Sequence, residues 1–85
     1  MSSHPTDFQG DILAAIRTAV EGAIENARCE VSGGNGHYAL VVTSSAFSGL
    51  GMLASQRLVY GAIAHLMKGA APPIHAVDSL VTRPA

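Results

Sequence analysis

The strongest constraint on the fold is a glycine-rich turn between two runs of β-forming residues. Residues 33–36 have the sequence Gly-Gly-Asn-Gly. Asn-Gly is the preferred pair of a type I′ hairpin turn, because both central residues need a positive φ. Residues 27–32 alternate apolar and charged side chains, and residues 37–43 are rich in β-formers. The pattern predicts a β-hairpin over residues 27–43.

A helix is predicted before the hairpin, over residues 7–21. Thr6 followed by Gln9 matches a capping box, in which the hydroxyl accepts from a first-turn amide and the glutamine reaches back. Gly22 favours an end of the helix there. The apolar residues recur at helical spacing, and they are Phe8, Ile12, Leu13, Ile16, Ala19, Val20 and Ala23.

The rest of the chain predicts a loop, a second helix and a third strand. The loop over residues 44–51 is rich in Ser and Gly, and we expect its one aromatic residue, Phe47, to pin it onto the core. From Met52 a second apolar stripe predicts a helix that ends at Lys68-Gly69, a cation followed by a glycine. Residues 74–82 have a strand pattern.

The predicted order of elements is α-β-β-α-β, in a chain of 85 residues that is long enough for one domain. Residues 1–6 are expected to form a disordered tail and residues 7–83 a single domain. Two helices over a three-stranded sheet make a two-layer α/β sandwich, in the α+β class. Because a long helical connection joins the second and third strands, they can pair in parallel, which makes the sheet mixed.

Composition argues against several functional classes. Five Lys and Arg against six Asp and Glu give a formal net charge of −1, and the cations are scattered, so no basic patch for nucleic acid is indicated. No apolar run approaches the roughly 20 residues that span a bilayer, and the first residues do not resemble a signal peptide. The single cysteine cannot form an internal disulfide. We therefore expect a cytoplasmic protein.

Catalytic motifs are missing from the sequence. It has no Walker loop, no Gly-x-Ser-x-Gly, no paired metal-binding histidines on a helix and no Cys-x-x-Cys. Asp78 follows His75 by three residues, so on one strand the two side chains would point to opposite faces and could not form an acid–base pair. We therefore expect a protein that is not an enzyme.

Several segments in the same order resemble the BolA family. The family pattern is Ser-x-x-Phe-x-Gly, then Arg-Leu-Val-Tyr, then Ile/Val-His-Ala. The matching segments here are residues 31–38, which hold the glycine-rich turn, and residues 45–49, 56–60 and 74–77. The resemblance covers residues 11–82. It implies an α-β-β-α-β fold related to type II KH domains, and a partner of monothiol glutaredoxins that carry a Cys-Gly-Phe-Ser motif.

The resemblance also implies a shared [2Fe–2S] cluster, for iron–sulfur trafficking or for iron and redox sensing. The glutaredoxin and its glutathione supply the sulfur ligands, and the family's Ile-His-Ala histidine corresponds to His75. A second ligand, His or Cys, comes from the hairpin loop. Loop cysteines align near Asn35, which is a poor iron ligand, and this leaves His37. The residues expected to contact the partner are Asn35, Gly36, Arg57 and Ala76.

Structural roles stay open for these residues. Instead of binding a metal, His75 could cap the sheet or hydrogen-bond a backbone carbonyl. His37 could be an ordinary exposed strand residue. Arg57 could be solvated, or could belong to a partner or nucleic-acid surface.

Other residues are given ordinary roles. Cys29 is expected to be a buried, inert thiol rather than a ligand. The Val59-Tyr60 pair is expected to pack in the core beneath the sheet. His65 is expected on the surface of the second helix, and His4 is assigned no role.

The alternative function is a KH-like, nucleic-acid-binding regulator of transcription. KH domains clamp nucleic acid with a Gly-x-x-Gly loop, and residues 33–36 fit that spacing. However, they lie between two predicted strands, whereas the KH loop joins two helices. Many family members also carry basic residues where residues 51–56 here are uncharged. For the isolated protein we expect a monomer or a weak homodimer that holds no stable cluster.

Overall fold

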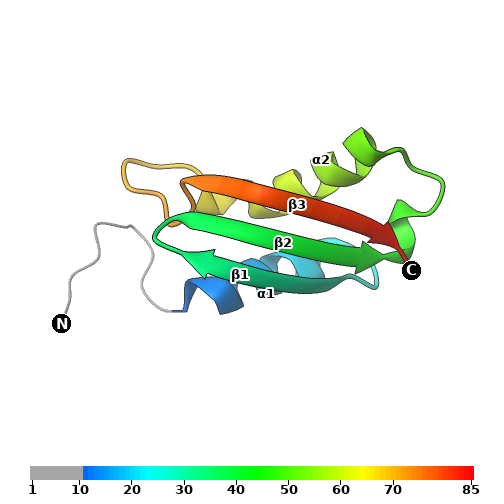
Figure 1. Cartoon of the computed structure of the whole chain (residues 1–85), viewed down its shortest axis with the longest axis horizontal. Coiled ribbons are helices and arrows are strands. Elements are labelled where there is room, and N and C mark those ends of the chain that lie inside the picture. Colours follow the sequence, from blue (N-terminus) through cyan, green and yellow to red (C-terminus); the bar gives the residue numbers. More distant parts are fainter. Residues whose placement is uncertain (1–10) are drawn as a thin grey trace.

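The computed structural model describes residues 11–85 and has two helices and a three-stranded sheet (Figure 1). The elements are α1 (Ile12–Ala23), β1 (Arg28–Gly34), β2 (His37–Ser44), the 3₁₀ turn η1 (Ser45–Phe47), α2 (Met52–Ile63), the 3₁₀ turn η2 (Ala64–Leu66) and β3 (Ala76–Pro84). The strand order is β1-β2-β3, with β1 antiparallel and β3 parallel to β2. The α+β class, the element order and the mixed sheet are as predicted.

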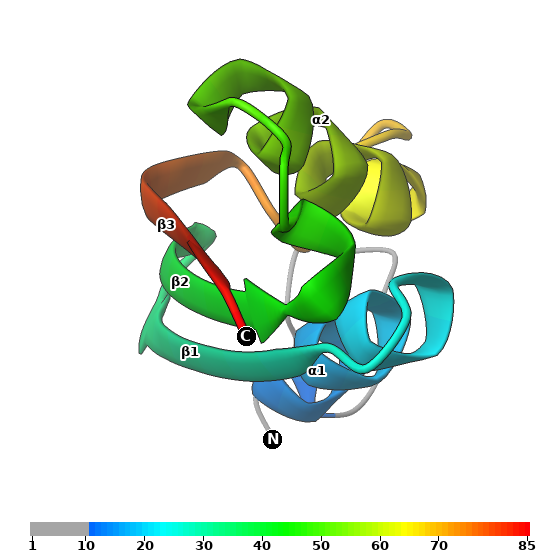
Figure 2. The same ribbon diagram turned by 90° about the vertical axis from the view of Figure 1, so that its right-hand side faces the viewer.

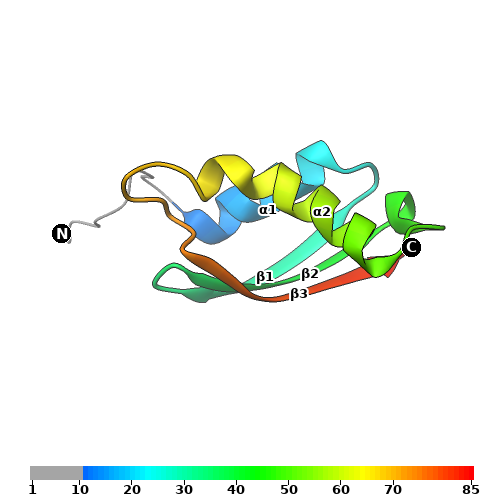
Figure 3. The same ribbon diagram turned by 90° about the horizontal axis from the view of Figure 1, so that it is seen from above.

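Both helices pack on the same face of the sheet, and the core lies between the two layers (Figures 2 and 3). Along β2 the alternate residues Tyr38, Leu40 and Val42 are buried against the helices. The other buried apolar residues are Ile16, Val20, Ile24, Cys29, Phe47, Val59, Ile63, Leu66 and Ile74. Among the described residues, no helix is long and apolar enough to cross a membrane.

The first helix begins later than the predicted residue 7. Asp11 has an extended backbone (φ −83°, ψ 106°), and its side-chain oxygen accepts from the Ala14 amide at 3.1 Å, so α1 starts at Ile12. Asp11 is therefore the N-cap. The expected capping box of Thr6 and Gln9 and the expected tail over residues 1–6 lie outside the described residues.

The second helix ends earlier than predicted. Regular α-helix stops at Ile63, and the chain tightens into η2 before reaching Gly69, where φ is +105°. The 3₁₀ turn buries Leu66, whose carbonyl oxygen accepts from the Ile74 amide at 3.1 Å. Because Leu66 is held in the core by this turn, the apolar pattern continues past the end of the α-helix.

The hairpin and the loop after it match their predictions. Asn35 and Gly36 have φ of +55° and +84°, the positive values that the type I′ turn requires. Phe47 in η1 is buried, so it anchors the loop as expected. The third strand starts at Ala76 rather than at residue 74, because the Ile74 amide is bonded to η2 instead of to β2.

Candidate functional site

The tip of the hairpin is bonded to the segment that enters β3. The carbonyl oxygen of Gly36 accepts from two successive amides, that of His75 at 2.7 Å and that of Ala76 at 3.0 Å. His37 follows the turn and pairs with Ala76 in the β2–β3 register. The parallel pairing of these strands therefore brings the two predicted ligand histidines to one end of the sheet.

The two histidine rings are neighbours. The ring centroids of His37 and His75 lie 6.3 Å apart, with 78° between the ring planes. Both residues are exposed. Two imidazoles bound to one tetrahedral metal ion, with metal–nitrogen bonds of about 2.0–2.1 Å, would have centroids roughly 5 Å apart. The observed separation is about 1 Å longer than this.

The His75 ring fills a space that is open because residue 36 is a glycine. A β-carbon built on Gly36 would be 2.5 Å from Nδ1 of His75 and 2.6 Å from its Cγ. The Nδ1 edge of the ring therefore occupies the space that a side chain at residue 36 would need. The three ring atoms nearest to this β-carbon are Nδ1, Cγ and Cε1. Nε2 is therefore the ring nitrogen farther from Gly36, and it is the better placed to bind a ligand.

Asp78 contacts His37, and the sequence did not predict this contact. Its Oδ1 lies 3.1 Å from Nδ1 of His37, and the two side chains are 58% and 56% exposed. The partner of Asp78 is therefore His37, which comes from the neighbouring strand β2. Asp78 also lies at an irregularity in β3, for which no local signal exists in the sequence.

The irregularity is a shift of one residue in the pairing of β2 with β3. Tyr38 pairs with Val77 and the next residue, Ala39, pairs with Ser79, so Asp78 has no partner on β2. An extra residue of this kind is a β-bulge, and bulges re-aim side chains. Strict strand alternation therefore does not apply across this part of β3.

The donor set can supply only part of a metal centre. Among residues 11–85, no group of three or more His, Cys, Asp or Glu side chains is placed to hold a metal ion. The pair of imidazoles fits iron or zinc chemically, but a complete coordination sphere needs ligands from a second molecule.

The remaining predicted residues fall into two groups. Asn35 and Ala76 lie beside the histidines, at the turn and at the start of β3. Arg57 is exposed on α2, in the helix layer. The structure therefore assembles Asn35, Gly36 and Ala76 around the histidine pair, and puts Arg57 on a different element.

Cys29 is not part of this site. It is 3% exposed in β1, and burial, with a further contribution from the charge of Glu21, raises the pKa of its thiol to about 11. A thiol that stays protonated is a poor metal ligand, because the thiolate is the binding form. The buried position expected for Cys29 is confirmed.

The expected role of Tyr60 is wrong. Val59 is fully buried as predicted, but Tyr60 is 40% exposed, because consecutive residues of a helix point in different directions and only one can face the sheet. His65 is exposed as expected, although it lies in η2 rather than within the second helix.

The glycine-rich turn does not have the position of a KH loop. Residues 33–36 close the β1–β2 hairpin, instead of joining two helices as in a KH domain. The five cations are exposed and lie on different segments of the chain, and they are Arg17, Arg28, Arg57, Lys68 and Arg83.

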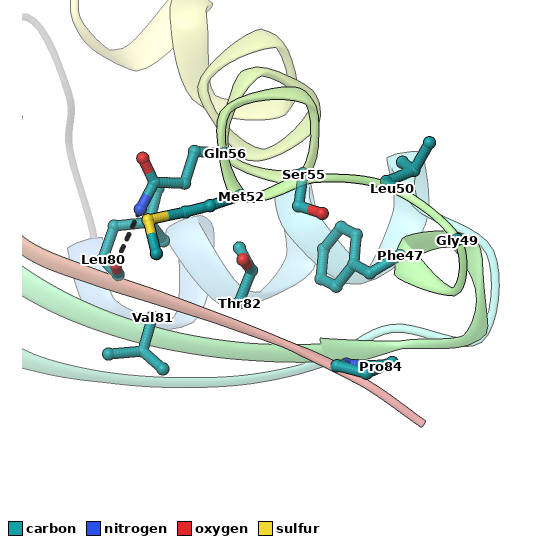
Figure 4. Close-up of a pocket in the computed structure, with 10 residues that line it drawn as sticks. All are labelled: Phe47, Gly49, Leu50, Met52, Ser55, Gln56, Leu80, Val81, Thr82 and Pro84. Atoms are coloured by element: carbon teal, nitrogen blue, oxygen red, sulfur yellow. Dashed lines mark hydrogen bonds between the residues drawn. The ribbon is translucent and has the colours of Figure 1, made fainter.

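A concave surface lies at the end of the sheet away from the histidines, between the start of α2 and β3 (Figure 4). This groove has a volume of about 370 Å³. The amide of Gln56 crosses it and donates to the Leu80 carbonyl at 3.1 Å, and Met52 at its rim is 73% exposed. Its lining residues include no acidic, basic, cysteine or histidine side chain. The groove therefore supplies no acid–base, nucleophilic or metal-binding group of these kinds.

Comparisons with known proteins agree with this fold. The family of BolA-like proteins matches residues 11–84. The solution structure of BolA1 from Mus musculus matches with a TM-score of 0.68 and 28% identity, over 99% of this chain and 73% of that one. A BolA homologue from Coxiella burnetii has a TM-score of 0.62 and 24% identity, over 84% of this chain and 85% of its own. No curated protein sequence matches.

A third solved structure, a BolA-like hypothetical protein from Rickettsia prowazekii, has a TM-score of 0.57 and 19% identity, over 94% of this chain and 99% of that one. At these lower identities the bacterial structures support the fold alone.

Proposed function

Because the chain belongs to the family of BolA-like proteins, we propose that it is a non-enzymatic adaptor that binds a monothiol glutaredoxin and shares a [2Fe–2S] cluster with it. The observation that carries the proposal is the pair of exposed imidazoles, with ring centroids 6.3 Å apart, at the tip of the hairpin. Two ligands on one exposed edge suit a cluster that a second protein completes.

The two histidines have equivalent roles in this proposal. His75, held against Gly36, and His37, at the start of β2, each present a ring nitrogen to one iron. The thiolate ligands come from the glutaredoxin and its glutathione. Imidazole in place of thiolate makes the ligand set less negative, and such a replacement raises the reduction potential of a cluster. This change suits transfer of a cluster or the sensing of iron.

The partner would approach the hairpin end of the sheet. Asn35 is exposed at the turn and Ala76 is half-buried beside it, so a docked protein could contact both while reaching the histidines. Because this chain supplies only two ligands, the isolated protein, as a monomer or weak homodimer, should hold no stable cluster. Binding of nucleic acid, the other function considered, is disfavoured by the formal net charge of −1.

The test is to mix the protein with a monothiol glutaredoxin loaded with a [2Fe–2S] cluster and to record visible circular dichroism. The wild-type protein should change the cluster spectrum, and size-exclusion chromatography should show a mixed complex. His75→Ala and His37→Ala should each reduce or abolish the spectral change. His65→Ala is the matched control, because it removes an exposed histidine from η2, and it should behave as the wild type.

The outcomes separate the alternatives. If the wild-type protein leaves the spectrum unchanged and forms no complex, the glutaredoxin partnership is refuted. If the complex forms but the two histidine variants act as the wild type does, the partnership stands and these histidines are not its ligands.

A further inference from the structure

We propose that Asp78 is a positioning residue for His37, holding its ring with the proton on Nδ1 so that Nε2 is free to bind iron. The inference rests on the proposed function for the role of His37 as a ligand. It starts from the 3.1 Å contact between Oδ1 of Asp78 and Nδ1 of His37.

The chemistry of the contact determines the tautomer. An ionised carboxylate can only accept hydrogen bonds. Nδ1 of His37 must therefore be the donor, and in the neutral ring Nε2 then carries the lone pair that binds metal. Histidines that bind metals commonly donate their other ring N–H to a carboxylate, which fixes the ring and raises its basicity.

The register of β2 with β3 puts the carboxylate on the same face of the sheet as His37. Ala76 pairs with His37, and Asp78 is two residues further along β3, just before the pairing shifts. The pairing of the two strands therefore supplies His37 with a partner from the neighbouring strand.

The two histidines are positioned by different means. The Nδ1 edge of His75 rests against the backbone of Gly36, whereas Nδ1 of His37 meets a side chain. Loss of the Asp78 carboxylate should therefore alter His37 and leave His75 unchanged. This difference gives the proposal an internal control.

The primary test needs no cluster. Two-bond ¹H–¹⁵N correlation spectra of the free protein, recorded about two pH units above the ordinary histidine pKa, report which nitrogen of each neutral ring carries the proton. His37 should carry it on Nδ1 in the wild type and move mainly to Nε2, the tautomer that free histidine favours, in Asp78→Ala. Asp78→Asn keeps a neutral acceptor and should retain part of the Nδ1–H population.

Two controls accompany the substitution. Glu30→Ala removes another exposed acid from the same sheet and should leave His37 unchanged. The rings of His75 and His65 should keep their wild-type spectra in Asp78→Ala, which also shows that the variant is folded. A wild-type His37 protonated on Nε2, or a tautomer unaltered in Asp78→Ala, would overturn the proposal.

A second measurement connects the tautomer to cluster binding. In the visible circular dichroism titration with loaded glutaredoxin, Asp78→Ala should need about tenfold or more protein to reach the same spectral change. An Asp78→Ala variant that titrates as the wild type does would overturn the functional half of the proposal. A wild type that gives no spectral change refutes the glutaredoxin partnership instead, and the tautomer spectra still decide whether Asp78 orients His37.

Discussion

The imidazole ring of His75 lies against the α-carbon of Gly36, in the space where any other residue would carry its β-carbon. The same glycine adopts φ +84° in the turn, and its carbonyl oxygen accepts from the amides of His75 and Ala76. One residue thus meets the steric requirement of the hairpin and holds the segment that carries a candidate ligand. Fold and site are coupled at this position.

Gly36→Ala should therefore destabilise the protein and displace the His75 ring. The positive φ alone costs a non-glycine residue about 1–2 kcal/mol, and the overlap with the ring adds to it, so we expect a loss of about 1–3 kcal/mol in urea unfolding. The ring resonances of His75 should shift in NMR spectra. Gly34→Ala is the control, since its β-carbon would meet no atom within 4 Å. Equal effects of the two substitutions would contradict the steric argument.

Ser44→Ala should be costly although it removes a single oxygen. The Ser44 hydroxyl is fully buried, donates to the Glu25 carbonyl at 2.5 Å and accepts from the Ala46 amide at 3.0 Å. Its loss leaves the Glu25 carbonyl and the Ala46 amide without this partner, which should lower the free energy of unfolding by about 1–3 kcal/mol. Ser45→Ala removes only an exposed side-chain contact with Asn26. It should change the free energy of unfolding by less than about 0.5 kcal/mol. Chemical denaturation of both variants checks the difference.

Stability should fall as the pH rises from about 9 to about 11, in part through Cys29. Burial and the charge of Glu21 raise the pKa of this thiol from 9.0 to about 11. Between these values the native state binds more protons than the unfolded state, so the free energy of unfolding decreases with pH. The full effect is of order 2 kcal/mol.

Urea unfolding on both sides of this window checks the contribution of Cys29. The wild type should lose more stability than Cys29→Ala between about pH 8 and about pH 10.5, because only the wild type carries the thiol and all other groups are common to both proteins. The same loss in the two proteins would show that the thiol titrates normally.

Asp11→Ala should weaken the start of α1. The Asp11 side chain accepts from the Ala14 amide at 3.1 Å, and removing an N-cap of this kind costs about 1 kcal/mol. Asp11→Asn keeps an acceptor oxygen and should retain most of the stability. Thermal unfolding followed by circular dichroism measures both variants, and an alanine variant as stable as the wild type would show that Asp11 does not cap the helix.

Local patterns predicted the parts of the fold that depend on local conformation. Asn-Gly at residues 35–36 adopts positive φ more readily than other residue pairs do, so the hairpin could be placed from the sequence. The burial of Phe47 could be predicted because a single aromatic side chain in a polar loop is removed from water only by packing on the core. The end of α2 was misplaced, since Leu66 keeps the apolar rhythm while a 3₁₀ turn buries it.

The candidate site, like the fold, could be predicted only in part from the sequence. His75 and His37 were selected by their resemblance to a family pattern, whereas neither Asp78 nor the contact of His75 with Gly36 was anticipated. Tyr60 was misassigned because the pattern alone could not say which way α2 is rotated on the sheet.

The sequence by itself determined the order of elements, the turn and most of the core, because these follow from backbone preferences and short-range apolar periodicity. Only the tertiary structure decided which side chains meet at the end of the sheet. The register of β2 with β3, in which His37 pairs with Ala76, is a long-range property of two strands that lie far apart in the chain. A shift of this register by one residue would place Asp78 on the opposite face from His37, and so the neighbours of His37 could be known only from the fold.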